Sequence, residues 1–499
     1  MNEKEGPLSM AVLRRLSLII GLFLIGLVIE PLPAAAAATD PAHPGLGAVL
    51  PLWSIIPFAG ILLSIALCPL LTPAFWHHHY GKVSAFWAIV FAVPAVYVYR
   101  EMAIHPIIHI YLIDYIPFII LLWGLFTIAG GIVVSGSLRG TPLVNSILLL
   151  IGTILASWVG TTGASMVMIR PVMRANRDRE RKAHIIVFFI FLVSNIGGAL
   201  TPLGDPPLFL GFLHNVPFFW VTTAILPHML LTSAILMGIF YALDTFYYRK
   251  EQRSGQKAPA ESGEKTPIRI DGAYNLLFLA GVVGLVLMSG YWKAGCFTVL
   301  GTDLYYQNIA RDIGILVMGF LSLYFTPRKL REANEFGWAP IIEVAKLFAG
   351  IFMTIIPALG ILQAGHQGAL AGLLAYVKEP VAYFWVSGSL SSFLDNAPTY
   401  LTFFYMALGQ LGMTEAMVPG ACAIGTPTGN PEFVALLKGI SAGSVFMGAN
   451  TYIGNAPNFM VKSIAEEAGI AMPSFFGYMF KYSIPILIPV FLIVTFLFF

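Results

Sequence analysis

The sequence predicts an all-α polytopic membrane protein made of two inverted-topology repeats. Of its 499 residues 58% are hydrophobic and 11% are charged, and the mean hydropathy is +0.80. Apolar stretches of about 18 residues or more recur along the chain, each long enough to cross the roughly 30 Å hydrocarbon layer as a helix. A net charge of +3, with Lys and Arg in short loops, gives no support for a nucleic-acid partner. We therefore expect the lipid bilayer to be the main partner.

Residues 1–38 have the pattern of a bacterial secretory signal peptide. Arg14 and Arg15 precede an apolar run, and an alanine-rich tract follows. Cleavage is expected near Ala36 to Ala38, and the alternative is an uncleaved first helix. In both cases the chain that follows begins outside, and we expect a multi-pass protein of the bacterial inner membrane.

The charged loops predict the topology, because Lys and Arg are enriched in cytoplasmic loops close to helix ends. Two apolar spans separate each basic loop from the next, so all three loops lie on the cytoplasmic side. The middle loop is rich in Ser, Gly, Pro and charges, as linkers are. The predicted basic loops are 174–184, 247–270 and 326–335, and the predicted units are a first repeat at 39–246, a linker at 247–271 and a second repeat at 272–499.

Each half contains about five spans and one hydrophobic stretch that cannot complete a crossing without breaking the charge rule. These stretches are about 142–173, with both ends cytoplasmic, and about 380–412, with both ends outside. We expect both to be re-entrant helical hairpins. Since the first half starts outside and the second inside, the halves are inverted copies, an arrangement in which secondary transporters build a site near the bilayer midplane.

Four motifs support the repeat. "GTTGASMVMIRP" (160–171) precedes "SNIGGALTPLGDPPLFLGF" (194–212), and "FLDNAPTYLTFF" (393–404) precedes "GANTYIGNAPNFMV" (448–461). Gly and Pro interrupt a helix, and exposed backbone at membrane depth is tolerated only beside protein or a watery cavity. Freed carbonyls and helix ends can bind a small ion there. Alignment of the later motifs matches Thr201 with Thr451, Gly204 with Gly454, Asp205 with Asn455 and Pro207 with Pro457.

These motifs resemble those of the ion transporter superfamily, and the resemblance covers nearly the whole mature chain. "SNIGGALTPLGDPP" is similar to the superfamily element N-x-G-G-x-x-T-P-x-G-x-P, most closely to the branch of citrate transporters and NhaD-like sodium:proton antiporters. The resemblance implies a scaffold domain, a moving transport domain with both hairpins, a homodimer and elevator-like alternating access. The superfamily also includes divalent-anion/sodium symporters, whose Ser-Asn-Thr hairpin tips bind sodium and substrate carboxylates. The chain differs from them, with Thr161-Thr162-Gly163 and Asp395-Asn396-Ala397 at these places.

Two carboxylates are the expected sites of proton and cation exchange. Asp395 is the first choice, because an ionisable residue at membrane depth usually faces an ion or proton pathway. Asp205, in the opposed broken helix, is the second. Neutral oxygens suited to a hard cation surround them in the motifs. These candidate ligands are Thr161, Thr162, Ser165, Asn195, Thr201, Asn396, Thr399, Asn450, Thr451 and Asn455.

Structural roles are the alternative for these residues. Asp395 could serve only as an N-cap before Asn-Ala-Pro. Asp205, which precedes two prolines, could only shape a turn. The threonines and asparagines could merely satisfy the backbone groups freed by the breaks.

Sodium/proton antiport is the leading functional hypothesis, with Na⁺ or Li⁺ and H⁺ as transported ions and no cofactor. Competition of a proton and a cation for one carboxylate amounts to antiport. The alternative is sodium- or proton-coupled transport of citrate or a dicarboxylate. An intramembrane enzyme would need a nucleophile or metal motif such as His-Glu-x-x-His, and the sequence contains none. A passive channel is a further alternative, but paired hairpins of opposite orientation suit alternating closure better than a continuous pore.

Overall fold

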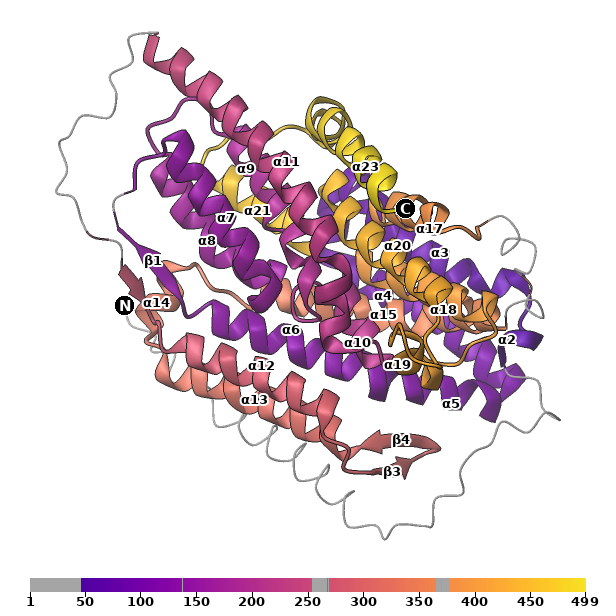
Figure 1. The fold of residues 1–499 in the computed structure, drawn as a ribbon. Helices are drawn as coiled ribbons and strands as arrows, with labels where there is room; N and C mark the ends of the chain where they lie inside the picture. The colour runs from indigo at the N-terminus through magenta and orange to yellow at the C-terminus, as the bar shows by residue number, and fades with distance from the viewer. Residues whose placement is uncertain (1–45, 137, 254–266, 268, 365–368, 370–376) are drawn as a thin grey trace.

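The computed structural model describes residues 46–136, 138–253, 267, 269–364, 369 and 377–499, and these residues are mostly helical (Figure 1). Ten described helices are long and apolar enough to cross a membrane, and an apolar helix at Asn275–Tyr291 is shorter. The prediction of an all-α polytopic membrane protein is thus confirmed. The predicted signal peptide lies outside the described residues.

The first half contains three long helices, a helical hairpin, a broken helix and one further long helix. The third long helix runs continuously from Glu101 to Ala129 and contains a π-helical segment. Its elements are α2 (Leu46–Val49), η1 (Leu52–Ile55), α3 (Ile56–Leu71), α4 (Pro73–Tyr99), α5 (Glu101–His109), η2 (Ile110–Tyr115), α6 (Ile116–Ala129), β1 (Val133–Ser135), α7 (Pro142–Val159), α8 (Thr161–Ala175), α9 (Ala183–Leu192), η3 (Ile196–Leu200), α10 (Pro206–Leu213) and α11 (Phe218–Arg253).

The second half repeats this order, with a short β-hairpin between its first two helices. Helix α11 continues to Arg253, so the first part of the expected linker is helical. The elements are β2 (Arg269–Asp271), α12 (Asn275–Tyr291), β3 (Cys296–Val299), β4 (Thr302–Tyr305), α13 (Tyr306–Phe325), α14 (Arg328–Ala333), α15 (Ala339–Gln363), α17 (Pro380–Ser391), α18 (Asn396–Gln410), η5 (Glu415–Met417), α19 (Val418–Ala421), α20 (Pro431–Met447), η6 (Gly448–Asn450), α21 (Ala456–Glu467), α22 (Phe475–Tyr478), η7 (Met479–Ser483) and α23 (Ile484–Phe498).

Two antiparallel strand pairs complete the fold. Strand β1 pairs with β2, with Val133 opposite Asp271, and so ties the end of α6 to the start of the second half. Strand β3 pairs with β4, with Cys296 opposite Tyr305.

Helix breaks occur within both predicted hairpins. In hairpin 1 (α7 and α8) the break is Gly160, whose φ of 80° is accessible to glycine at little cost. In hairpin 2 (α17 and α18) the break ends at Asp395, the N-cap of α18. The re-entrant placement of the hairpins in the bilayer remains a prediction.

The two broken helices are α9–η3–α10 and α20–η6–α21, and their backbones approach closely at the break. A Cβ atom on Gly204 would lie 2.1 Å from the carbonyl oxygen of Gly198, and one on Gly454 would lie 2.5 Å from that of Gly448. A side chain would clash at such distances, so the same close approach of the backbone explains why both aligned positions, Gly204 and Gly454, are glycine.

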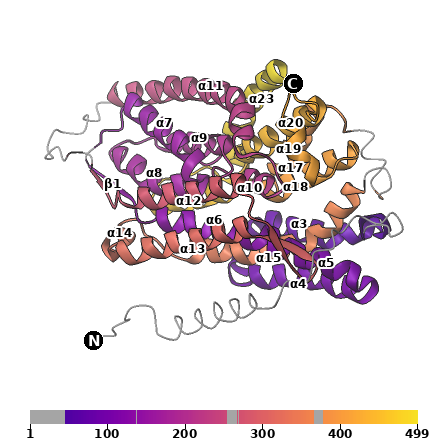
Figure 2. The ribbon, with the colours of Figure 1, turned by 60° about the horizontal axis from the view of Figure 1, so that its bottom comes forward.

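The helices form two groups, seen on opposite sides of Figure 2. In the support group, α6 packs on α12 and α13, and α15 packs on α3 and α4. In the hairpin group, the two hairpins and two broken helices pack on one another and on α11 and α23. The groups meet where α6 contacts α8 and α10, and where α15 contacts α18. The support group is α3 to α6 with α12, α13 and α15; the hairpin group is α7 to α11 with α17, α18, α20, α21 and α23.

Candidate ion-binding site

Each hairpin break is hydrogen-bonded to the break of the broken helix that follows it. In the first half the hydroxyl of Thr201 donates to the carbonyl oxygen of Ser157. In the second half the hydroxyl of Thr451 donates to that of Ser392. The aligned threonines therefore have the same role in the two repeats, which is to satisfy backbone carbonyls freed by the hairpin breaks.

Asp205 lies where both repeats meet. Its carboxylate accepts hydrogen bonds from the hydroxyl of Thr161 at 2.9 Å, from the amide of Asn455 at 3.0 Å and from the amide of Asn396. These donors come from hairpin 1, the second broken helix and hairpin 2. The residue is 1% exposed. The structure thus brings together four of the predicted site residues, three of them around the carboxylate of the fourth.

Asp395 lies at the edge of this cluster. It is partly exposed, and its carboxylate accepts a hydrogen bond at 3.1 Å from the backbone N–H of Ala397, which caps α18. It directly precedes Asn396, whose amide donates to Asp205. Asp395 therefore caps α18, and its role in ion exchange remains a prediction, while Asp205 lies at the centre of the cluster.

Several buried amide oxygens near the breaks have no hydrogen-bond donor among the described residues. They are the Oδ1 atoms of Asn195, Asn396 and Asn450. The Nδ2 groups are bonded: that of Asn195 donates to Asn458 at 2.7 Å and that of Asn450 to Ser392 at 2.9 Å. An unpaired buried acceptor costs about 1–3 kcal/mol, and amide oxygens are ligands for hard cations.

The other predicted residues contact neighbouring backbone or hydroxyl groups. The hydroxyls of Ser165 and Ser194 lie 2.9 Å apart, and that of Thr399 donates at 2.9 Å to the carbonyl of Asp395. Thr162 is partly exposed beside Thr161. These residues support the breaks rather than contact Asp205 in the described hydrogen bonds.

Three of the four helices that begin at the breaks have N-termini poorly suited to an anion, and the fourth, α8, begins with neither a proline nor a side-chain cap. Helix α10 begins with Pro206 and Pro207, which have no N–H, and α21 has Pro457 in its first turn. Helix α18 is capped by the carboxylate of Asp395. Because anion binding at a helix N-terminus relies on free N–H groups, these three ends offer few donors for it.

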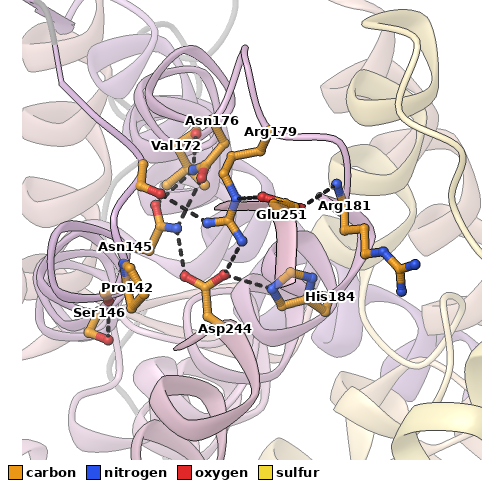
Figure 3. Close-up of polar contacts among 11 residues, drawn as sticks. Pro142, Asn145, Ser146, Val172, Asn176, Arg179, Arg181, His184, Asp244 and Glu251 are labelled. Carbon is orange, nitrogen blue, oxygen red and sulfur yellow. Dashed lines mark hydrogen bonds and ion pairs between the residues drawn. The ribbon is translucent and has the colours of Figure 1, made fainter. Parts of the chain in front are cut away.

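A polar network joins the start of α7 to the end of α8, which together form the open end of hairpin 1, opposite its break (Figure 3). Asn145 of α7 and Asn176 after α8 exchange reciprocal amide hydrogen bonds of 3.0 and 2.7 Å. Asn145 also donates to Asp244 of α11 at 2.9 Å. The two arms of the hairpin are thus joined to each other and to α11.

Arg179 is the cation of this network. It donates to Asp244 at 2.8 Å, to Glu251 at 2.7 Å and to the carbonyl of Gly140 at 2.9 Å (Figure 3). His184 lies 2.9 Å from the same carboxylate of Asp244. The sequence analysis missed this network, although Asp244 was visible as an ionisable residue near the end of an apolar span, the signal that could have found it.

The open end of hairpin 2 has fewer bonds. The hydroxyl of Tyr383 in α17 donates to Gln410 of α18 at 2.9 Å. Beyond α18, Glu415 lies 2.9 Å from His214, which follows α10, and accepts a hydrogen bond from Tyr405 at 2.5 Å. This histidine was also missed by the sequence analysis.

An all-α membrane fold with two broken helices, two hairpins and a buried polar site defines a membrane transport protein. A family model described as "Putative citrate transport" matches residues 47–499. The chain belongs to this citrate-transport family, which confirms the resemblance seen in the sequence and makes it a transporter rather than an enzyme. No curated protein matches the sequence.

Proposed function

We propose that this protein is a secondary transporter that exchanges sodium for protons by alternating access, with Asp205 as the exchanging group. The observation that supports this most is the buried Asp205 carboxylate, whose described hydrogen-bond donors are all neutral: Thr161, Asn396 and Asn455. No Arg, Lys or His is among its described partners. A carboxylate in such surroundings needs a proton or a metal cation to balance its charge.

The same neutral side chains can serve either occupant. A hydroxyl and an amide each present both a donor and an acceptor, so rotation of Thr161 or of the Asn396 amide replaces a donor with an oxygen. The orphan amide oxygens of Asn195 and Asn450 offer further acceptors close to the breaks. Sodium, a hard cation, prefers such oxygen ligands.

Charge balance supplies the coupling. With either a proton or a sodium ion, the Asp205 site is neutral, and without either it contains an unpaired buried charge. Moving that charge through the membrane costs several kcal/mol or more. The loaded forms therefore cross readily and the empty form does not, which makes exchange obligatory.

Coupled citrate transport is the second candidate, because the family match favours it. Citrate is a polyanion and would need basic side chains or free helix N-termini. Asp205 and the proline-rich start of α10 supply neither, and at the uncapped start of α8 the first residue, Thr161, is already hydrogen-bonded to the Asp205 carboxylate. The geometry thus favours the cation as the transported species.

The test uses proteoliposomes with an acidic interior and a pH-sensitive dye. Sodium, lithium, potassium and citrate are added in turn to wild type, Asp205→Asn and Asp395→Asn, with Asp312→Asn as a matched control in α13. We expect sodium or lithium to release protons in wild type and control, weakly in Asp395→Asn and not in Asp205→Asn. If cations leave the gradient unchanged while citrate collapses it or accumulates, antiport is wrong and citrate transport replaces it.

A further inference from the structure

His214 lies between two carboxylates at the C-terminal end of α10, and Asp205 lies at the N-terminal end of the same helix. Its Nε2 is 2.9 Å from Asp114 and its Nδ1 is 2.9 Å from Glu415. His214 and Asp114 are 1% and 2% exposed. The hydroxyl of Tyr405 donates to the second oxygen of Glu415.

The geometry indicates the charge of this cluster. A neutral imidazole has one N–H, whereas both ring nitrogens of His214 face a carboxylate oxygen at hydrogen-bond distance. An imidazolium places its positive charge between the two carboxylates, whereas a neutral imidazole would turn the lone pair of one ring nitrogen toward a carboxylate oxygen 2.9 Å away. The cluster therefore combines one cation with two anions, and the cation is shared between Asp114 and Glu415.

The two contacts of His214 join different groups of helices. His214 directly follows α10 and Glu415 follows α18, so both belong to the hairpin group, in which α10 packs on α18. Asp114 is in η2, which packs on α15 of the support group. One contact is thus internal to the hairpin group, and the other spans the boundary between the groups.

The two contacts also differ in geometry. The Nδ1 contact with Glu415 meets hydrogen-bond criteria. The Nε2 of His214 and the Oδ1 of Asp114 are equally close but are not aligned as a hydrogen bond, and neither has another partner among the described residues. The contact across the boundary is therefore mainly electrostatic, so it can break without loss of a well-formed hydrogen bond.

We propose that the Asp114–His214 ion pair is a latch that holds the hairpin group against the support group in this conformation and opens in each transport cycle. Alternating access moves one group of helices relative to the other, so a contact that spans the boundary has to break. His214 stays with Glu415 during the movement, which keeps the buried imidazolium paired. The latch rests on the alternating access of the proposed function and not on the identity of the transported ion.

A second pair across the boundary provides a reporter. Arg170 of α8 lies 2.8 Å from Glu335. Glu335 follows α14, which is joined to the support group because Arg331 donates to the carbonyl of Thr127 in α6 and Asn334 to that of Gly130. The side chain of Glu335 is 68% exposed, so this pair contributes little to stability. Cysteines at these two positions can therefore record the proximity of the two groups without removing the proposed latch.

The experiment measures cross-linking of Arg170→Cys/Glu335→Cys by a short bifunctional maleimide, after the three native cysteines are replaced by serine. We expect Asp114→Asn to slow cross-linking at least about fivefold, because the latched conformation is less populated. Asp114→Glu, which keeps the charge, and Asp312→Asn, which removes an ion pair within α13, should match the parent.

The proposal would be overturned if folded Asp114→Asn protein, judged by its elution in size-exclusion chromatography, cross-linked at the unchanged rate. It would also be overturned if Asp312→Asn slowed cross-linking equally. If Asp114→Asn does not fold, His214→Gln is measured by the same criterion. A failure of sodium-driven proton release in proteoliposomes would reject antiport and would leave the cross-linking result unaffected, so the two failures are distinguishable.

Discussion

The open ends of the two hairpins occupy equivalent places in the two repeats, and they are held by different chemistry. Hairpin 1 is joined to α11 by a buried ionic network around Arg179 and Asp244. In the described part of hairpin 2, neutral bonds of Gln410 join the arms, one from Tyr383 at 2.9 Å and a long one to the carbonyl of Lys378, just before α17, at 3.5 Å. Its nearest ionic contact, through Glu415, leads to Asp114 of the support group by way of His214.

The difference separates an anchor from a latch. The described partners of Arg179, which are Asp244, Glu251 and the carbonyl of Gly140, lie in or beside the hairpin group, so this network can stay intact while that group moves. The His214 cluster spans the boundary, so part of it has to open. Pseudo-symmetry of the backbone therefore does not imply equal mobility, and the charged residues decide which hairpin is the more firmly fixed.

Removal of the cation of the anchor should have the largest effect on stability. We expect Arg179→Gln to cost roughly 3–5 kcal/mol of unfolding free energy, because it leaves Asp244 buried without its cation. Thermal unfolding in detergent measures this. Arg177→Gln, an exposed arginine in the same loop, should stay within about 0.5 kcal/mol of wild type. Equal losses in both variants would contradict the anchor.

Loss of the Glu415 charge should have a smaller effect that does not vary between pH 5 and 8. Burial raises the pKa of Glu415, but the charge of His214 and its hydrogen bond, with help from Tyr405 and His109, outweigh burial and lower the pKa to about 2. A depressed carboxylate pKa contributes stability that is complete above the ordinary value and is lost as the pH falls through about 2.

We therefore expect the melting temperature of Glu415→Gln to lie below that of wild type by a constant amount from pH 5 to 8, for a loss of about 1.5–3 kcal/mol. Thermal unfolding at four pH values in this range checks it. A difference that shrinks as the pH is lowered from 8 to 5 would show that Glu415 takes up a proton in that range, against this account.

The hairpin breaks themselves should differ in their tolerance of alanine. Gly160→Ala places a Cβ at φ 80° and ψ 149°, a conformation that essentially only glycine adopts, 3.3 Å from the carbonyl oxygen of Leu203, and we expect a loss of about 1–3 kcal/mol. Asp395→Ala removes an N-cap, for about 1 kcal/mol. Differential scanning fluorimetry compares the two variants, and a greater loss for Asp395→Ala would reverse the expected order.

The smallest effect is expected at the base of hairpin 2. Tyr383→Phe removes one neutral hydrogen bond to Gln410 and should cost about 1 kcal/mol. Thermal unfolding of Tyr383→Phe and Arg179→Gln under the same conditions compares the stability contributed at the open ends of the two hairpins. A Tyr383→Phe loss as large as that of Arg179→Gln would remove the distinction between the hairpins.

The helix breaks could be predicted from the sequence because they depend on local chemistry. Clusters of glycine and proline disfavour a continuous helix, so the motifs around Gly160, Gly204 and Gly454 marked the breaks without knowledge of the fold. Single prolines do not suffice, since Pro227 and Pro357 lie inside α11 and α15. Asp205 and Asp395 were both recognised as candidates. Their ranking was not accessible, because it depends on which of them Asn396 and Asn455 reach from other parts of the chain.

The two ionic clusters could not be assembled from sequence for the same reason. Asp114, His214 and Glu415 are each about a hundred residues or more from the next, and Arg179 is 65 residues from Asp244. Sequence marks such residues as ionisable groups in or near apolar spans but does not pair them. Their partners are determined by how the helices pack.

The central claim, that Asp205 exchanges a proton for sodium, is tested most directly by sodium binding to the purified protein. Titration calorimetry at pH 6 and pH 8, in two buffers of different ionisation enthalpy, measures affinity and proton release together. We predict weaker binding at pH 6, release of a proton on binding and no binding to Asp205→Asn. Sodium binding that is independent of pH and survives Asp205→Asn, or binding of citrate alone, would contradict the account.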